Sequence, residues 1–127
     1  MKQKFSKKWK ASKQPRKQRK YKAKAPLHLK YKMLSVHLSK ELKKKYKKRS
    51  IPVRKGDVVK IIRGSFKGKK GKISKVNTKK TITHIEGIQR TRKDGTKVNV
   101  PFHPSNLIIL ELNLEDKKRN KKLKKGE

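Results

Sequence analysis

The sequence predicts a mainly β protein, a small closed barrel of five short strands with a short N-terminal helix and long basic tails. Three observations predict this fold class. The apolar residues concentrate between Ile51 and Leu114, they occur in short runs, and turn-forming glycines separate those runs. Short strands joined by tight turns favour a closed barrel, because closure removes the aggregation-prone edges of an open sheet.

Five strands are expected, at residues 57–63, 72–76, 81–88, 97–100 and 107–110. In the first of them, Val59 and Ile61 alternate with their neighbours and should share one face. Asp94 and Gly95 form the strongest hairpin signal and predict a two-residue type I′ turn, in which Gly95 readily adopts a positive φ.

A short helix is expected over residues 38–46, ahead of the strands. Ser39 is a good N-cap, and Glu41 lies in the first turn, where the helix dipole favours an anion. Leu42 and Tyr46 then fall on one stripe that can pack against a sheet. The chain therefore divides into a basic arm (1–37), a helix with the barrel (38–114) and a basic tail (115–127), which is either frayed or a short helix.

The arm carries much of an extreme positive charge. The chain has 43 Lys and Arg against 8 Asp and Glu, a net charge of +35, and residues 1–32 contain no acidic residue. Low hydrophobicity and high charge predict that the arm is disordered in isolation, and Pro15 and Pro26 are expected to break any helix there. Phe5, Trp9 and Tyr21 are spaced among its lysines, which favours an RNA-binding arm because aromatic faces stack on bases while cations hold phosphates.

Other classes of function lack the residues they require. There is no cysteine, the four histidines are not spaced as metal ligands, and the scattered carboxylates pair with no nucleophile. We therefore expect no enzyme, no metal or other cofactor and no small-molecule substrate, and no segment is apolar enough to enter a membrane. The glycine-rich segment 63–72 is not a Walker A loop, because Gly64 and Gly68 enclose three residues rather than four. Its glycines should shape a turn, and its lysines should contact phosphate.

Residues 56–73, continuing to 86–88, resemble the KOW motif, which ribosomal proteins and transcription elongation factors share. The flanking segments are SKQPRKQRK at 12–20, APLH at 25–28, LSKEL at 38–42, SIPVRKGD at 50–57 and PFHPSNL at 101–107. Together they resemble the universal large-subunit ribosomal protein family, numbered twenty-four in bacteria and twenty-six in eukaryotes, in its archaeal-type form.

This resemblance implies an SH3-like barrel that binds large-subunit ribosomal RNA beside neighbouring ribosomal proteins. It also implies an early role in subunit assembly, a place near the polypeptide tunnel exit, and a cytoplasmic location in the large ribosomal subunit. The sequence departs from the family pattern at Lys47, where relatives usually have Gly, at Lys70, where an acidic residue is common, and in the extra basic extension 1–11 with its Trp9.

Two alternatives remain beside the ribosomal interpretation: a regulatory KOW module of an elongation factor, and a generic DNA-compacting protein. The polybasic arm counts against the first, and the predicted barrel counts against the second. The residues expected to contact RNA are Lys7, Lys8, Trp9, Lys10, Lys13, Gln14, Arg16, Lys17, Gln18, Arg19, Lys20, Lys30, His37, Lys40, Arg54, Arg63, Lys67, Lys69, Lys70, His103 and Ser105.

Overall fold

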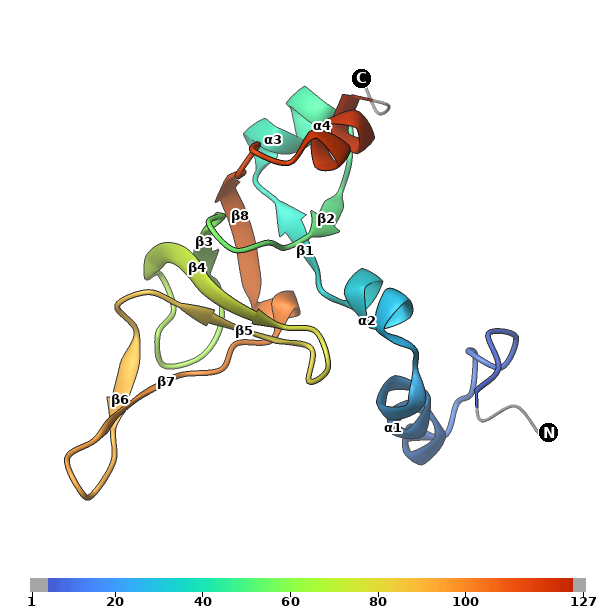
Figure 1. Ribbon diagram of the computed structural model, residues 1–127, viewed down its shortest axis with the longest axis horizontal. Coiled ribbons are helices and arrows are strands. Elements are labelled where there is room, and N and C mark those ends of the chain that lie inside the picture. Colours follow the sequence, from blue (N-terminus) through green and yellow to red (C-terminus); the bar gives the residue numbers. More distant parts are fainter. Residues whose placement is uncertain (1–4, 125–127) are drawn as a thin grey trace.

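The computed structural model describes residues 5–124 of the 127 (Figure 1). Residues 1–4 of the predicted arm and residues 125–127 of the predicted tail lie outside the described residues. The strands are β1 (Ser35–Leu38), β2 (Ser50–Pro52), β3 (Val58–Ile61), β4 (Lys70–Asn77), β5 (Ile82–Ile85), β6 (Gln89–Thr91), β7 (Lys97–Asn99) and β8 (Leu107–Glu111). The helices are α1 (Pro15–Lys24), α2 (Leu27–Met33), α3 (Lys40–Tyr46) and α4 (Lys117–Lys124), with a 3-10 turn η1 (Pro104–Asn106). The protein is therefore mainly β, as predicted.

Six strands form one sheet in the order β2-β1-β8-β3-β4-β5, and β6 pairs with β7 in a separate hairpin. All neighbours in the sheet are antiparallel except β1 and β8, which are parallel. Among the described residues no pairing joins β2 to β5, so the sheet stays open, and neither the closed barrel nor the number of five strands is confirmed. Strands β1, β2 and β6, each of three or four residues, were not predicted from the sequence.

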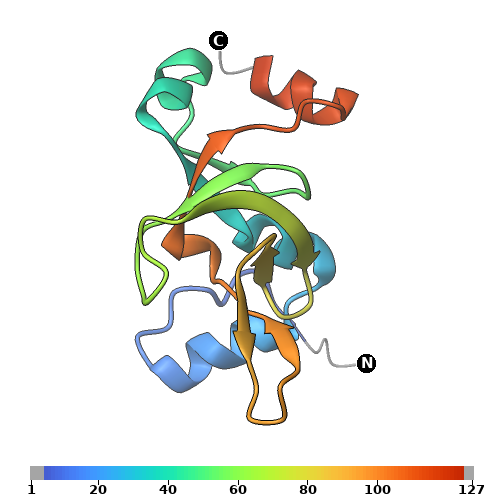
Figure 2. The ribbon, with the colours of Figure 1, turned by 90° about the vertical axis from the view of Figure 1, so that its left-hand side faces the viewer.

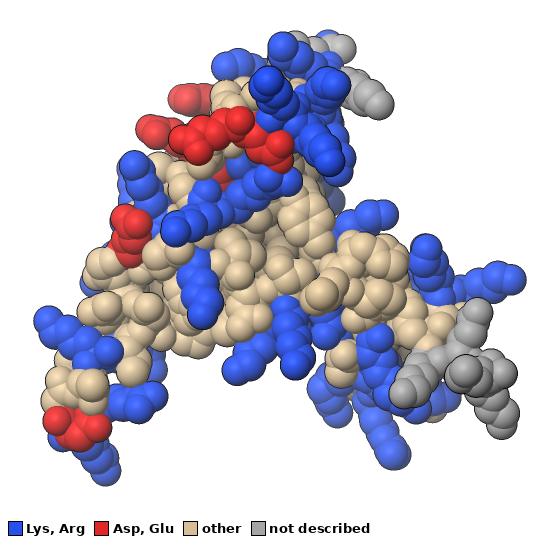
Figure 3. All heavy atoms as spheres, in the orientation of Figure 1, with Lys and Arg blue, Asp and Glu red and all other residues tan. Residues whose placement is uncertain are grey.

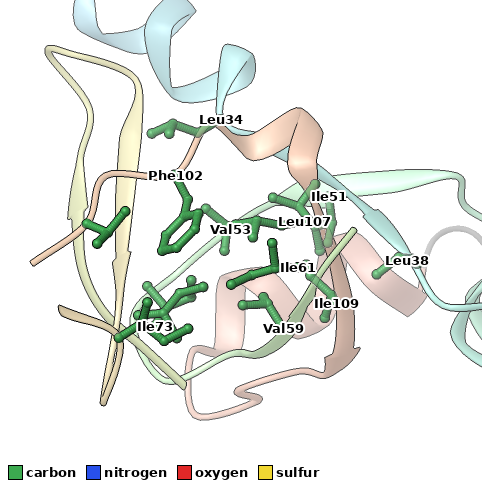
Figure 4. Packing of buried hydrophobic residues seen from close by; sticks show 14 of the residues in the cluster. Leu34, Leu38, Ile51, Val53, Val59, Ile61, Ile73, Phe102, Leu107 and Ile109 are labelled. Carbon is green, nitrogen blue, oxygen red and sulfur yellow. The ribbon is translucent and has the colours of Figure 1, made fainter. Parts of the chain in front are cut away.

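The core lies on one face of the sheet (Figure 4). Val59 and Ile61 of β3 are fully buried, and they cluster with Ile73, Leu107 and Ile109 of the neighbouring strands. The predicted alternation in this strand is confirmed, since the residues between and beside them are only partly buried.

Helix α3 confirms the predicted helix. The Ser39 hydroxyl accepts a hydrogen bond from the Leu42 backbone N–H at 3.4 Å, and Tyr46 is buried in the core. Lys47 follows the helix with a φ of 52°, so it occupies the left-handed conformation that glycine adopts at helix ends. Lysine accepts this position at a cost of about 1–2 kcal/mol.

The arm differs from the expectation, because it contains two helices. Pro15 is the first residue of α1, and Pro26 is the N-cap of α2. Proline is well tolerated at a helix start, where its missing N–H would have had no partner in any case. The prediction was therefore wrong for Pro15, which starts a helix, whereas Pro26 separates the end of α1 from the start of α2.

The β6–β7 hairpin has a longer loop than expected. The Arg92 N–H donates to the Thr96 carbonyl at 2.8 Å, and the Gly95 N–H donates to the Arg92 carbonyl at 3.0 Å. Gly95 has a φ of 90° but Asp94 has no positive φ, whereas a type I′ turn needs positive φ at both central residues. The predicted two-residue turn is wrong, and a three-residue loop, 93–95, replaces it. The Asp94 carboxylate accepts hydrogen bonds from the Thr96 hydroxyl and N–H, which lower the pKa of Asp94.

The tail forms the helix α4, the second of the two predicted possibilities. Arg119 in this helix is 3% exposed and grips the fully buried Asp57 through both ends of its guanidinium, with two N–O distances of 2.7 Å. Leu123, one turn further along, joins the core. The Arg119–Asp57 ion pair, which we call the clamp, and the packing of Leu123 thus hold α4 against the sheet.

Figure 2 shows how these parts are distributed. Helices α3 and α4 lie at one end of the sheet, and the arm and the β6–β7 hairpin extend toward the other. No helix among residues 5–124 is long and apolar enough to cross a membrane.

Candidate nucleic-acid interface

Charge is unevenly distributed over the molecule. On the face drawn in Figure 3, acidic side chains gather near the end of β8 and other acidic groups lie apart, one of them at the tip of the β6–β7 hairpin, whereas the arm shows only Lys and Arg as charged residues. A surface of one sign concentrates the field and attracts a polyanion. The arm is therefore the first candidate surface.

We define the arm surface as the predicted contact residues of the N-terminal segment and α1. It consists of Lys7, Lys8, Trp9, Lys10, Lys13, Gln14, Arg16, Lys17, Gln18, Arg19 and Lys20, all of which are exposed. Helix α1 buries no residue and has neither an acidic residue in its first turn nor a side-chain cap. Folding therefore gives little support to this helix, and its side chains are available to a partner.

A second surface is the turn between β3 and β4, which we call the turn surface and define as Arg63, Lys67, Lys69 and Lys70. All four side chains are exposed. The turn folds tightly because Gly64 and Gly68 have φ of 98° and 88°. The Gly68 N–H then donates to the Ile61 carbonyl at 2.8 Å, which closes the turn.

Gly71 serves a different purpose from the turn glycines. A Cβ atom at Gly71 would lie 2.6 Å from Cγ2 of Ile85, so β4 and β5 can approach only because no side chain intervenes. The predicted structural role of the glycines therefore divides into backbone conformation at Gly64 and Gly68 and close packing at Gly71.

Cation–π contacts with Phe66 join the β3–β4 turn to the β6–β7 hairpin. The Lys69 ammonium lies 5.1 Å from the ring centroid of Phe66, and the Arg90 guanidinium of β6 lies 5.8 Å from the same centroid. Both distances suit cation–π attraction. Arg90 was not predicted as a contact residue, although the basic residues Arg92, Lys93 and Lys97 of the same hairpin could have indicated it.

Four further predicted residues are exposed: His37 in β1, Lys40 at the start of α3, and His103 and Ser105 at the η1 turn. His103 and Ser105 bond each other, with the Ser105 N–H donating to the His103 Nδ1 at 3.2 Å. This local bond caps the η1 turn. It fixes the two side chains but leaves them on the surface.

Lys30 and Arg54 bond to other residues of the protein, although the Arg54 side chain is 40% exposed. Lys30 is 8% exposed and donates to the Lys79 carbonyl at 3.2 Å. Arg54 donates to the Tyr31 hydroxyl at 3.3 Å and pairs with Asp116, and the bond to Tyr31 is the largest cause of its raised pKa. These contacts tie α2 and the tail to the sheet, which gives both residues a structural role that the sequence did not indicate.

Asp116 in the tail acts as a counter-charge within the molecule. Its carboxylate accepts from the Lys118 N–H at 3.0 Å and pairs with Arg54, and both contacts lower the pKa of Asp116. Over residues 5–124, no group of three His, Cys, Asp or Glu side chains is placed to hold a metal ion.

Comparison with known proteins places the chain beside ribosomal proteins. Residues 12–126 match the family model that describes the ribosomal proteins L26 of eukaryotes and their archaeal L24 counterparts. The chain is also 48% identical over 112 residues to the large ribosomal subunit protein uL24 of Methanosphaera stadtmanae, and the match covers 88% of this chain and 96% of that protein.

Proposed function

The chain belongs to the family of large-subunit ribosomal proteins numbered twenty-four in archaea and twenty-six in eukaryotes, and we propose that it binds ribosomal RNA through the arm and turn surfaces. As a member of this family it is a structural component of the large subunit of the cytoplasmic ribosome. The family match includes the basic segment from residue 12 onward, so it favours the ribosomal interpretation over a KOW module of an elongation factor.

The observation that carries the proposal is the exposure of the basic arm. Every predicted contact residue of α1 is exposed, and none has an acidic neighbour within residues 5–32. Clustered like charges destabilise one another unless a polyanion neutralises them, and in a ribosomal subunit that polyanion is RNA. The arm would lie between RNA helices, and the sheet with its turn surface would fix the orientation.

The arm surface also suits one of the finer roles that the family resemblance implies, an early role in assembly. A protein that neutralises phosphates over a long arm can join RNA segments before other proteins cover them, which suits an early step of subunit assembly. We also propose the place near the polypeptide tunnel exit, on the resemblance alone, and contacts with neighbouring ribosomal proteins. We propose no catalytic activity.

The first test removes residues 1–24, which deletes α1 but keeps the Lys30 and Tyr31 contacts with the sheet unit. This truncation removes twelve Lys and Arg residues. Each neutralised phosphate contributes roughly 0.7–0.9 to the slope of log affinity against log salt, so the truncated protein should bind large-subunit RNA with a clearly shallower slope. Filter binding over a salt series measures it. An unchanged slope would mean that the arm does not contact phosphate.

The second test separates the turn surface from charge in general. Replacing Lys67, Lys69 and Lys70 with Gln should weaken RNA binding and leave the melting temperature nearly unchanged, because exposed lysines contribute little to folding. The control replaces Lys117, Lys121 and Lys124 of α4 with Gln, which removes the same charge from exposed positions elsewhere. Equal RNA affinity of the two variants would remove the turn from the proposed interface.

A further inference from the structure

The segment before α1 folds back against α1, and together they border an open hollow of about 530 Å³, which we call the arm pocket. Its wall comes from the segment before α1, from α1 itself and from one residue of α2. Phe5, Trp9, Tyr21 and Met33 supply apolar surface, and Lys10 and Lys17 are among the lysines that complete the lining. The volume lies within the range of about 300–1,000 Å³ that small-molecule sites occupy.

Folding alone does not explain the aromatic residues of this pocket. The rings of Phe5 and Tyr21 lie 4.9 Å apart at 43°, yet neither residue belongs to the hydrophobic core of the sheet. Trp9 is 64% exposed, and the Lys17 ammonium lies 4.9 Å from its ring centroid. A large aromatic ring that is mostly exposed and lies next to a positive charge suits binding better than packing.

The positive charge around the pocket indicates which class of ligand it can bind. The lining contains five lysines, two serines and a glutamine but no acidic residue. An apolar peptide would gain nothing from this basic rim, whereas a nucleotide has a flat base for the aromatic faces and a phosphate for the lysines. Gln18, whose amide N–H donates to the Ser12 carbonyl at 2.9 Å, holds the segment before α1 against the helix and so keeps the pocket formed.

We propose that the arm pocket receives an unstacked base of single-stranded RNA, which stacks on Trp9 while its phosphate contacts Lys17. This inference rests on the proposed RNA binding and adds a defined base-binding site to it. The site makes the extension before residue 12 a recognition element in addition to a source of charge.

Trp9 is the only tryptophan of the chain, so its fluorescence reports on the pocket directly. Three probes are titrated into the full-length protein: a short oligouridylate, an oligonucleotide of the same length without bases, and inorganic polyphosphate. Stacking should quench the fluorescence with oligouridylate and leave it nearly unchanged with the other two. Anisotropy of labelled oligouridylate and filter binding of large-subunit RNA are measured in parallel.

Substitutions of Trp9 test the base-binding site through the affinity for oligouridylate. Trp9→Leu should weaken oligouridylate binding by roughly 5- to 150-fold, the range of one base–aromatic stack, and Trp9→Phe should retain most of it. The matched control is Leu27→Ala, because Leu27 is 63% exposed but does not line the pocket. None of these changes should alter the affinity for the base-free oligonucleotide.

The results that would overturn the base-binding site differ from the result that would overturn the proposed RNA binding. Equal quenching by all three probes, no quenching despite binding, or a Trp9→Leu affinity equal to that of Leu27→Ala would overturn the base-binding site. The proposed function would survive each of those results as long as large-subunit RNA still binds. A full-length protein that fails to bind large-subunit RNA at all would overturn both.

Discussion

Replacing Arg119 with Met should destabilise the folded protein by about 3–5 kcal/mol, the usual cost of removing one partner from a buried ion pair. The fully buried Asp57 carboxylate would keep only two donors, the N–H groups of Arg54 and Asn113 at 3.0 and 2.8 Å. Methionine preserves much of the apolar stem, so the loss reports on the charge and its hydrogen bonds. For a folded unit of this size, 3 kcal/mol corresponds to a fall in melting temperature of roughly 12 °C or more.

Urea unfolding and thermal melts at matched ionic strength measure this effect. The control is Lys121→Met, because it removes the same charge from an exposed position of the same helix. A double-mutant cycle with Asp57→Asn then isolates the pair, and the double variant should lose clearly less than the sum of the single losses. An Arg119→Met protein as stable as the Lys121→Met protein would refute the clamp, as would single losses that add without coupling.

Two further changes test single contacts. Gly71→Val should cost about 1–3 kcal/mol of unfolding free energy in urea, because the new side chain overlaps Ile85, and an unaltered midpoint would show that β4 and β5 can separate freely. Asp116→Asn tests a carboxyl whose pKa is lowered by the Lys118 N–H and by Arg54. A lowered folded pKa stabilises above the ordinary value of 3.8 and loses that effect as the pH falls further, so the melting-temperature difference from the unmodified protein should vanish in acid. A difference that persists unchanged at the acid end would contradict this assignment.

The parts of the fold that local chemistry determines were predictable. The alternation around Val59 and Ile61, the cap at Ser39 and the glycines of the β3–β4 turn each carry a signal within a few residues. Strands β1 and β2 carry none, because each is stabilised by partners distant in sequence. The helices of the arm were missed because Pro15 was interpreted as a breaker when its position at a helix start makes it compatible with a helix.

In the candidate interface, as in the fold, only the features that depend on neighbouring residues in the sequence were predictable. Charge density along the chain identified the exposed lysines of the arm and the turn, because a long basic run has few ways to become buried. It could not separate Lys30 and Arg54, whose partners Lys79 and Asp116 lie 49 and 62 residues away. Arg119 was missed for the same reason, although it is the only Arg among the lysines of the tail. The guanidinium of arginine can bond both oxygens of a buried carboxylate at once, and so suits it better than the ammonium of lysine does.

The use of the acidic residues links the fold to the proposed partner. All three aspartates have partners within the protein: Asp57 pairs with Arg119, Asp116 contacts Arg54 and the start of α4, and Asp94 contacts Thr96 in the hairpin loop. None of these partners belongs to the arm, which has no acidic residue of its own up to residue 32. The chain thus uses these negative charges to hold the sheet unit together and leaves the arm without counter-charge. In the proposed complex, the phosphate backbone of RNA would supply the missing counter-charge.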